Sequence, residues 1–319
     1  MKSAPKYFVV LLFVIGIVFL TSCSNTTNDK QTDDKEYSAY LMAYFYDTKE
    51  KLCYAYSYDA RNWILLNNNN HVFDAKVRLR DPYISRVKGQ FHMVHTMGWD
   101  NPVIYHWVSS DLINWKGGPI TVVDNSRKRA WAPEFFYSAD EELFYVHWAS
   151  IYNGHNTIHY ITTKDWSDIT PENSAVYFDI GIHDIDLTIV KYNGIYYGFH
   201  KPGAVEDSLG IRILKTRTLK PGEDGFGFGK DGSGKEILLN QLKPIEAPEV
   251  IKLIGQQKWY IYADPFHYPM QAWETSDFSK FTKIDVNTPK DAKHCSMIPI
   301  TQKELDKLLA KYPNTISTK

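Results

Sequence analysis

A short turn signal recurs along the chain at nearly equal intervals, and it constrains the fold more than any other feature of the sequence. The signal reads Ser or Thr, a variable residue, and then Asp, or Thr in one degenerate copy. It stands at positions 59, 111, 165, 218 and 277, so the gaps are 52, 54, 53 and 59 residues. A period of this length is typical of a fold built from repeated supersecondary units.

Strand-like segments precede each signal in a fixed order. A run such as "DPYISRVKGQFHMVH" opens on a polar or Pro-containing cluster, turns, and continues into an aromatic strand. Aromatic residues favour strands and make up 15% of the chain. Five units of about four short strands each predict a five-bladed β-propeller, with residues 37–319 as a single domain. An all-β sandwich is the alternative, but a sandwich has no reason to repeat its turn signature five times.

The two ends of this domain predict how the ring closes. Residues 39–46 lack an opening strand, and residues 294–300 form a strand without a hairpin partner. Pairing the two segments would remove exposed sheet edges. A short helix should follow, because Thr301 and Glu304 have capping-box spacing and three leucines form an apolar stripe, namely Leu305, Leu308 and Leu309.

The cysteines of the domain do not predict a disulfide. The proposed closure places Cys295 on an innermost strand and Cys53 on the third strand of the same blade. These strands are not neighbours, and a disulfide needs its two Cα atoms within about 7 Å of each other. We therefore expect both thiols to be free.

The N-terminal segment predicts export. Two lysines precede an apolar run of thirteen residues, and small residues follow, as in a signal peptide. The run is short for a transmembrane span, which needs about 20 residues. "LTSC" resembles the lipobox of bacterial lipoproteins. The resemblance implies a signal peptide over residues 1–22, lipidation of Cys23, and a periplasmic or surface protein that contacts the membrane only through this anchor. Residues 23–36 are polar and predict a disordered tether.

Charged side chains stand where the innermost strand of each blade begins. The five openings are "RDP", "WAPE", "HDID", "EAPE" and "KHC", so four carry a carboxylate and the fifth a histidine. In a propeller these strand starts point toward one mouth of the central channel. Acidic residues at strand starts also cap turns. Clustered carboxylates, however, raise one another's pKa, which favours a ligand, a metal or a catalytic purpose.

Four of these motifs resemble those of glycoside hydrolase family 43. They are "RDPYI", "HDIDLTIV", "EAPEVIK" and "KHCSMIPI", and the resemblance extends from about residue 37 to residue 312. It implies a five-bladed propeller that cleaves arabinose- and xylose-containing glycans. It further implies that Asp81 is the general base, Asp186 orients the acid and adjusts its pKa, and Glu246 is the general acid. Glycosidic cleavage needs such an ionised base and protonated acid.

Two rival acids and two departures accompany this assignment. Asp184 competes with Asp186, because both lie on one face of a regular strand, but "IDLT" matches the family motif at Asp186. Glu249 competes less well with Glu246, which alone precedes a residue followed by Pro. The family's Gly after the acid is Ala247 here, and its Gly after the channel His is Cys295, so side chains stand where backbone comes close in relatives.

Further channel residues are candidates for substrate contact: Arg80, Trp131, Glu134, His183 and His200. Trp131 could stack on a sugar, and Arg80 could bond hydroxyl groups or steer Asp81. Each could equally be a simple channel-lining residue. In the family the channel histidine helps to hold a central calcium or water cluster, which implies the same for His294. A lone histidine is more often a structural hydrogen-bonder.

The function expected from this resemblance is that of an inverting, exo-acting glycosidase on plant-type glycans. An α-L-arabinofuranosidase is favoured over a β-xylosidase or an enzyme for β-galactosyl groups, and no cofactor is required. A retaining fructan hydrolase is one alternative, although its Asn-Asp-Pro motif is missing; a non-catalytic glycan-binding lipoprotein is another. The net charge of −1 gives no electrostatic footprint for nucleic acid. We expect a monomer.

Overall fold

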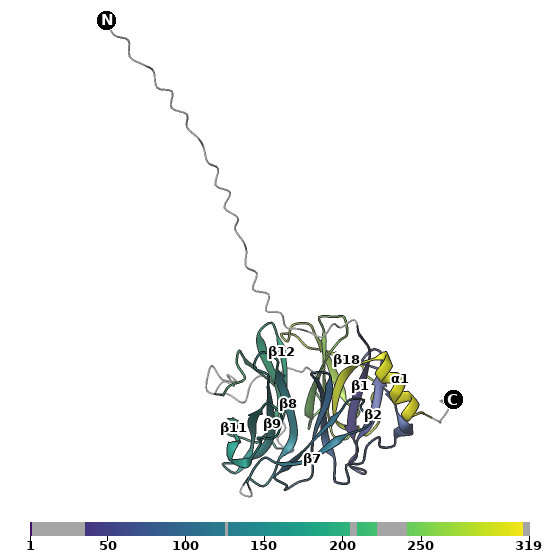
Figure 1. Cartoon of the computed structure of the whole chain (residues 1–319), viewed down its shortest axis with the longest axis horizontal. Coiled ribbons are helices and arrows are strands. Elements are labelled where there is room, and N and C mark those ends of the chain that lie inside the picture. The colour runs from purple at the N-terminus through teal and green to yellow at the C-terminus, as the bar shows by residue number, and fades with distance from the viewer. Residues whose placement is uncertain (2–35, 125–126, 205–208, 222–240, 315–319) are drawn as a thin grey trace. The chain divides into compact units, whose positions relative to one another are not determined.

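The structure is a computed structural model that describes Met1 and residues 36–124, 127–204, 209–221 and 241–314 (Figure 1). The chain divides into two units, residues 1–33 and 34–319. The signal peptide expected over residues 1–22 lies, apart from Met1, outside the described residues, as do Cys23 and all but the last residue of the expected tether over residues 23–36. Within the described ranges, no helix is long and apolar enough to cross a membrane.

Five antiparallel sheets make up the second unit and confirm the predicted five-bladed propeller. Four sheets have four strands, and the fourth blade along the ring has three within the described residues. In sheet order the strands are β19 (Lys293–Thr301), β1 (Tyr37–Phe45), β2 (Cys53–Ser57) and β3 (Ile64–Leu65); β4 (Arg80–Val87), β5 (Gln90–Thr96), β6 (Val103–Ser109) and β7 (Lys116–Thr121); β8 (Trp131–Ser138), β9 (Leu143–Tyr152), β10 (His155–Thr163) and β11 (Ala175–Phe178); β12 (Asp184–Tyr192), β13 (Ile195–Pro202) and β14 (Arg212–Thr216); β15 (Glu246–Lys252), β16 (Trp259–Asp264), β17 (Gln271–Thr275) and β18 (Thr282–Ile284).

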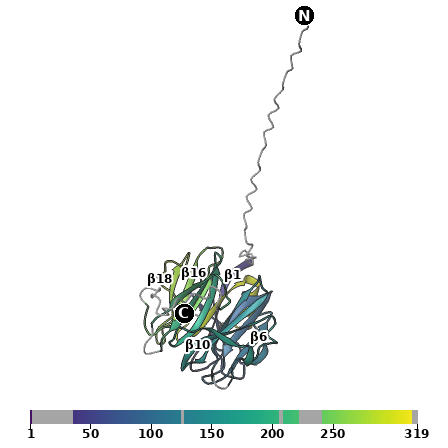
Figure 2. The ribbon, with the colours of Figure 1, turned by 90° about the vertical axis from the view of Figure 1, so that its left-hand side faces the viewer.

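The first strand of each blade lies at the centre of the ring. β4 contacts β8, β8 contacts β12, β12 contacts β15, β15 contacts β19, and β19 contacts β4. Figure 2 shows the sheet of β1 between the sheets of β16 and β6, as this order requires. Five clusters of buried apolar side chains each join two neighbouring blades. Because the apolar core is divided among these interfaces, the axis can hold polar side chains.

The ring closes as the sequence predicts. β19 pairs antiparallel with β1, and Met42 lies opposite Met297. Cys295 lies on β19 and Cys53 on β2, with β1 between them, and both buried thiols are free as expected.

The C-terminal helix α1 (Gln302–Lys311) fastens this closure. It begins with the predicted capping box of Thr301 and Glu304, and two of the three predicted leucines, Leu305 and Leu308, are buried. Glu304 also binds Arg86, at the far end of β4, through two parallel hydrogen bonds of 2.8 Å each. This pair joins helix α1, which follows β19, to the blade formed by β4, β5, β6 and β7. Among the described residues lie two short 3₁₀ helices, Asn67–Asn69 and Pro171–Asn173.

The repeated turn signal has a local cause. In the first blade copy, Asp59 accepts backbone N–H groups from Arg61 and Asn62, each at 2.8 Å, and closes the turn between β2 and β3. Asp111 does the same between β6 and β7. Burial raises the pKa of these carboxyls, but the donated hydrogen bonds outweigh it and lower the pKa of both to about 2.

Candidate active site

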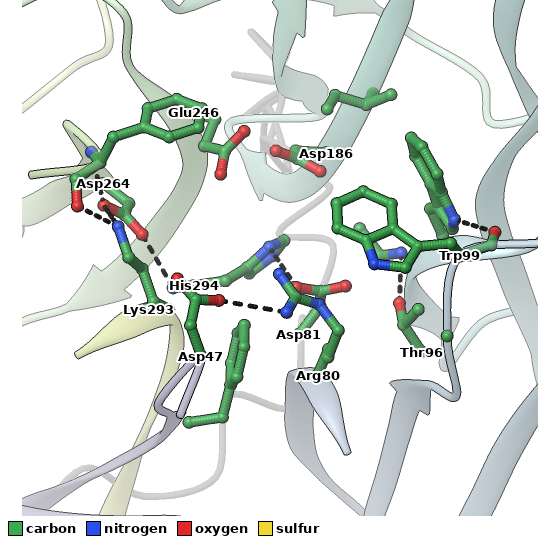
Figure 3. A pocket seen from close by; sticks show the side chains of 16 residues that line it. Asp47, Arg80, Asp81, Thr96, Trp99, Asp186, Glu246, Asp264, Lys293 and His294 are labelled. Carbon is green, nitrogen blue, oxygen red and sulfur yellow. Dashed lines mark hydrogen bonds and ion pairs between the residues drawn. The ribbon is translucent and has the colours of Figure 1, made fainter. Parts of the chain in front are cut away.

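One cavity of about 440 Å³ opens where the five inner strands begin. Every blade contributes to its lining, so residues far apart in sequence converge as predicted (Figure 3). Six of the predicted site residues line it: Arg80, Asp81, Trp131, Asp186, Glu246 and His294.

The backbone repeats one irregularity at this mouth. One residue near the start of each inner strand, the third in β12 and the second in the other four, has a positive φ: 49° at Asp81, 43° at Ala132, 58° at Asp186, 53° at Ala247 and 36° at His294. The register of each inner strand shifts across this residue, which marks a β-bulge. Non-glycine residues rarely adopt such angles, and bulges re-aim side chains. Four of these five residues line the cavity, namely Asp81, Ala132, Asp186 and His294, and in the fifth blade Glu246, next to Ala247, does so.

Asp81 and His294 form a charged pair within the cavity. His294 Nδ1 lies 3.3 Å from Asp81 Oδ1. Burial would lower the pKa of His294, but the charge of Asp81 and other acids raises the pKa to about 10. Burial would raise the pKa of Asp81, but His294 and Arg80 outweigh it and hold the pKa below its ordinary value. Asp81 is therefore an ionised carboxylate at neutral pH, as a general base must be.

Glu246 and Asp186 face one another on another side of the cavity (Figure 3). Asp186 Oδ2 accepts the Ala247 N–H at 3.0 Å, which ties β12 to the residue that follows Glu246. Burial, followed by the charges of Asp186 and Asp264, raises the pKa of Glu246 well above its ordinary range. This direction favours the protonated form of Glu246, the form that a general acid needs.

Aromatic side chains form a wall beside Asp81. The Arg80 guanidinium carbon lies 4.7 Å from the centre of the Phe45 ring and 5.3 Å from that of Trp99. Arg80 also binds Asp47 and Glu50, each at 3.1 Å. These contacts fix Arg80. The Trp99 ring lies against Arg80 and is thereby held at the edge of the cavity, although 58% of Trp99 is exposed.

Trp131 continues this wall. Its indole Nε1 donates to the Trp99 carbonyl at 2.5 Å, and the two rings meet edge to face at 5.3 Å between centroids. The Arg129 guanidinium carbon lies 4.2 Å from the centre of the Trp131 ring. The wall thus presents apolar ring surface beside charged groups, a combination that suits the apolar faces and hydroxyl groups of sugars.

The rival carboxylates lie elsewhere. Asp184 is buried, lies 2.7 Å from His200 Nδ1, and stands with it outside the cavity lining. Glu249 lies further along β15, outside the cavity lining, and burial raises its pKa to about 8. Glu134 occupies the equivalent position of its own blade, and burial and then the charge of Glu249 raise its pKa well above the ordinary range.

Three predicted substrate contacts therefore stand outside the cavity lining. Glu134 and His200 are 2% and 0% exposed, so they have no surface to offer a sugar. His183 accepts the Asn156 N–H through Nδ1 at 3.1 Å, next to the start of β12. These placements favour structural roles for Glu134, His183 and His200.

Ten further residues line the cavity without having been predicted as site residues, among them Asp47, Thr96, Trp99, Asp264 and Lys293. Thr96 and Asp264 end the second strand of their blades, directly opposite Arg80 and Glu246. In a hairpin, the end of one strand lies beside the start of the other. The same inner-strand openings could therefore have identified both residues through their hairpin partners.

The residues around His294 do not fit a metal ion. No group of three or more His, Cys, Asp or Glu side chains within the described ranges could hold one. Nδ1 of His294 faces the carboxylate of Asp81, and a protonated imidazole has no lone pair for a metal. The geometry makes His294 the cation that offsets the neighbouring acids.

The comparisons with known proteins agree with this site. Residues 35–306 match the model of a family related to glycoside hydrolase family 43 and described as "Probable glycosyl hydrolase domain". The chain belongs to this family. It is a glycosidase of the family 43-like type. No curated protein matches the chain significantly.

Solved structures share the fold at low sequence identity. The chain is similar to the GH43_1 enzyme from Xanthomonas citri complexed with xylotriose, with 12% identity over 67% of this chain and 75% of that one and a TM-score of 0.50. It is also similar to the GH43 BlXynB protein from Bacillus licheniformis, with 14% identity over 83% of this chain and a TM-score of 0.53. The chain spans 55% of the length of that protein.

Proposed function

We propose that this glycosidase is exo-acting, inverts the anomeric configuration, and releases terminal α-L-arabinofuranosyl groups, or β-D-xylosyl groups, from plant-type glycans. The position of Glu246 and Asp81 in the lining of one cavity carries the proposal, and the raised pKa of Glu246 and the lowered pKa of Asp81 support it. An inverting glycosidase needs one protonated and one ionised carboxyl on opposite sides of the scissile bond. A cavity of about 440 Å³ lies in the lower part of the usual range for ligand sites and suits the end of a glycan chain.

Each group has a defined step in this mechanism. Glu246 donates its proton to the glycosidic oxygen as the bond from that oxygen to the anomeric carbon breaks. Asp81 accepts a proton from a water molecule that attacks the anomeric carbon from the opposite face. After the reaction Glu246 is ionised and Asp81 is protonated, and proton exchange with solvent restores the starting form of both.

The neighbouring charges support these steps. His294 stabilises the carboxylate form of Asp81 before attack. Asp186 lies beside Glu246, disfavours its ionised form, and fixes the backbone after it through the Ala247 N–H. The wall of Trp99 and Trp131 offers ring faces against which a sugar can stack.

The proposed function is tested by activity and product configuration. The protein would be assayed on a panel of nitrophenyl glycosides and on arabinoxylan, arabinan and galactan, with NMR to identify the first anomer released. We expect α-L-arabinofuranosides to be cleaved fastest, with an inverted product. Release of the retained anomer, or activity only inside polymer chains, would contradict the proposal.

The role of Glu246 has a sharper test. Loss of a general acid typically costs about 10²–10⁴-fold in rate. Nitrophenolate leaves without much protonation, so Glu246→Ala should retain more activity on nitrophenyl glycosides than on a natural glycan. Glu172→Ala, an exposed substitution, is the matched control. An equal loss on both kinds of substrate would contradict the assignment.

We also propose that the protein is a lipoprotein anchored through Cys23. The support is the "LTSC" motif after the apolar run. The variant Cys23→Ala should leave the membrane fraction, and unchanged fractionation would overturn this proposal.

A further inference from the structure

Asp264 occupies a position that links the two halves of the site. It ends β16, directly opposite Glu246 in the hairpin of the acid's blade, and it lines the cavity with only 2% of its surface exposed. Figure 3 shows Asp264 and Lys293 on one side of His294 and Asp81 on the other. Asp264 therefore lies between the proposed acid and the partner of the proposed base.

Three donors hold the Asp264 carboxylate. Its Oδ1 accepts the Phe266 N–H at 2.8 Å and a hydrogen bond from Lys293 Nζ at 3.3 Å. Its Oδ2 accepts the His294 N–H at 3.3 Å. Lys293 also donates to the Phe266 carbonyl. The carboxylate thus joins β16 to β19 at the bulge residue whose imidazole contacts Asp81.

A comparison within the protein shows that this backbone bond does not need a charge. Thr96 occupies the same hairpin position in its own blade, opposite Arg80. Its hydroxyl accepts the N–H of Ala132, the bulge residue of the next blade, at 2.8 Å. A neutral side chain therefore satisfies an equivalent bulge N–H. A buried carboxylate is costly without a partner, yet the blade that carries Glu246 uses one, and Lys293 on β19 of the neighbouring blade balances its charge.

We propose that Asp264 is a positioning residue for the hydrolysis proposed above, in which its hydrogen bond to His294 fixes the base side of the cavity and its negative charge beside Glu246 favours the protonated acid. This inference rests on the proposed function. Lys293 is the counter-ion that holds Asp264 in place. The pKa of Glu246, raised by burial and by the charges of Asp186 and Asp264, is consistent with this role.

Two substitutions remove the charge of Asp264 and keep a hydrogen-bond acceptor. Asp264→Asn keeps the shape and an acceptor oxygen but removes the charge, and Asp264→Thr installs the neutral group that the Thr96 blade uses. Asp285→Asn is the control, because Asp285 is an exposed residue of the same blade. The measurements are kcat and KM on a natural glycan and on a nitrophenyl glycoside across pH, with the thermal midpoint of each variant.

Both Asp264 variants should fold with little change in the thermal midpoint. We expect kcat on the natural glycan to fall roughly ten-fold, a part of the whole contribution of a general acid, with a smaller loss on the nitrophenyl glycoside. The high-pH limb of the profile should move to lower pH, because Glu246 loses a neighbouring negative charge. A merely structural residue would not move that limb.

The possible failures are distinguishable. If Asp264→Asn matches Asp285→Asn in pH profile and in both rates, or if it loses both rates equally with an unchanged profile, the inference is wrong. If the wild-type protein cleaves no glycoside in the panel, the proposed specificity fails instead. If Glu246→Ala is as active as wild type on the natural glycan, the acid assignment fails, whatever Asp264 does.

Discussion

The two ends of strand β4 carry charged groups of similar exposure that serve opposite purposes. At its start, the Asp81 side chain is 15% exposed and shares the cation of His294 with other acids. At its end, the Arg86 and Glu304 side chains are 19% and 17% exposed and bind each other through two hydrogen bonds. The side chains at the two ends have similar exposed fractions, so the ends differ in how their charges are paired and not in burial.

This difference indicates where stability and reactivity reside. The Arg86 end has one cation for one carboxylate in bidentate geometry, stacked 4.2 Å from the centre of the Phe91 ring, and such pairs are the strong ones. The cavity end gathers more acids than cations and holds them on a positive-φ backbone, which costs free energy. The stability of the closed ring offsets the unfavourable free energy of the cavity end.

The largest expected effect is at the cavity end. Asp81→Ala should lower kcat/KM by about 10²–10⁴-fold, the usual contribution of a general base. The loss should be similar on nitrophenyl and natural substrates, because water needs the base in both reactions. The thermal midpoint should stay near that of wild type, because the bonds at the Arg86 end are intact.

Azide provides the rescue experiment for Asp81→Ala. This anion needs no deprotonation, so it should restore activity in part and yield a glycosyl azide of inverted configuration. An unrescued variant with a much lower thermal midpoint would instead make Asp81 a structural residue and remove the contrast between the two ends.

The next effect is at the other end of the strand. Arg86→Met keeps the apolar stem and removes the charge, and we expect it to lower the free energy of unfolding by about 1.5–3 kcal/mol, the range for hydrogen bonds to charged groups. kcat/KM should remain within about two-fold of wild type, a difference worth less than 0.5 kcal/mol. Denaturant unfolding and the same glycoside assay measure the two quantities.

The pH dependence of unfolding checks the cause. Burial raises the pKa of Glu304, but Arg86 outweighs it and lowers the pKa below its ordinary value. Unfolding thus makes Glu304 easier to protonate, so the pair stabilises fully above the ordinary glutamate pKa of about 4.3 and less as the pH falls below it. The wild type and Arg86→Met should converge in acid, and a constant difference would show that another contact is responsible.

Sequence reasoning located the inner-strand openings because the blade repeat places them in register. Strand alternation did not separate Asp184 from Asp186, since it puts residues two apart on one face of a regular strand, and only the family motif favoured Asp186. The bulge breaks that rule: the register shifts between Ile185 and Thr188, so Asp186 faces the cavity while Asp184 pairs with His200. Such a shift depends on contacts between blades, which no local pattern contains.

Asp264 and Trp99 escaped for related reasons. Asp264 belongs to the cavity through its register with Glu246, and Trp99 lies in a loop outside the strands, where strand patterns do not apply. The three acids of the family motif were predicted to converge, and they do. Their chemical roles remain predictions that the variants test.

A smaller effect concerns the electrostatics of the cavity alone. Asp186→Asn should move the high-pH limb of the pH–rate profile to lower pH, because Glu246 loses a negative charge that disfavours its ionised form. The asparagine oxygen can still accept the Ala247 N–H, so the thermal midpoint should change little. If the high-pH limb stays in place while the thermal midpoint falls, Asp186 stabilises the fold, as the Arg86–Glu304 pair does, and does not adjust the pKa of Glu246.

The smallest effect tests whether the mouth stores backbone strain. Ala247 has a φ of 53° and stands where the family has glycine. A non-glycine residue in this region costs about 1–2 kcal/mol, while glycine loses about 0.5–1 kcal/mol through its larger unfolded-state entropy. Ala247→Gly should therefore stabilise the fold by no more than about 1 kcal/mol, leave activity nearly unchanged, and preserve the N–H bond to Asp186.

Denaturant unfolding measures the gain, with Ala263→Gly, a buried position on neighbouring β16 without positive φ, as the destabilising control. Equal destabilisation by both substitutions would mean that the cavity end holds no strain at Ala247, and that its cost arises from clustered charge alone.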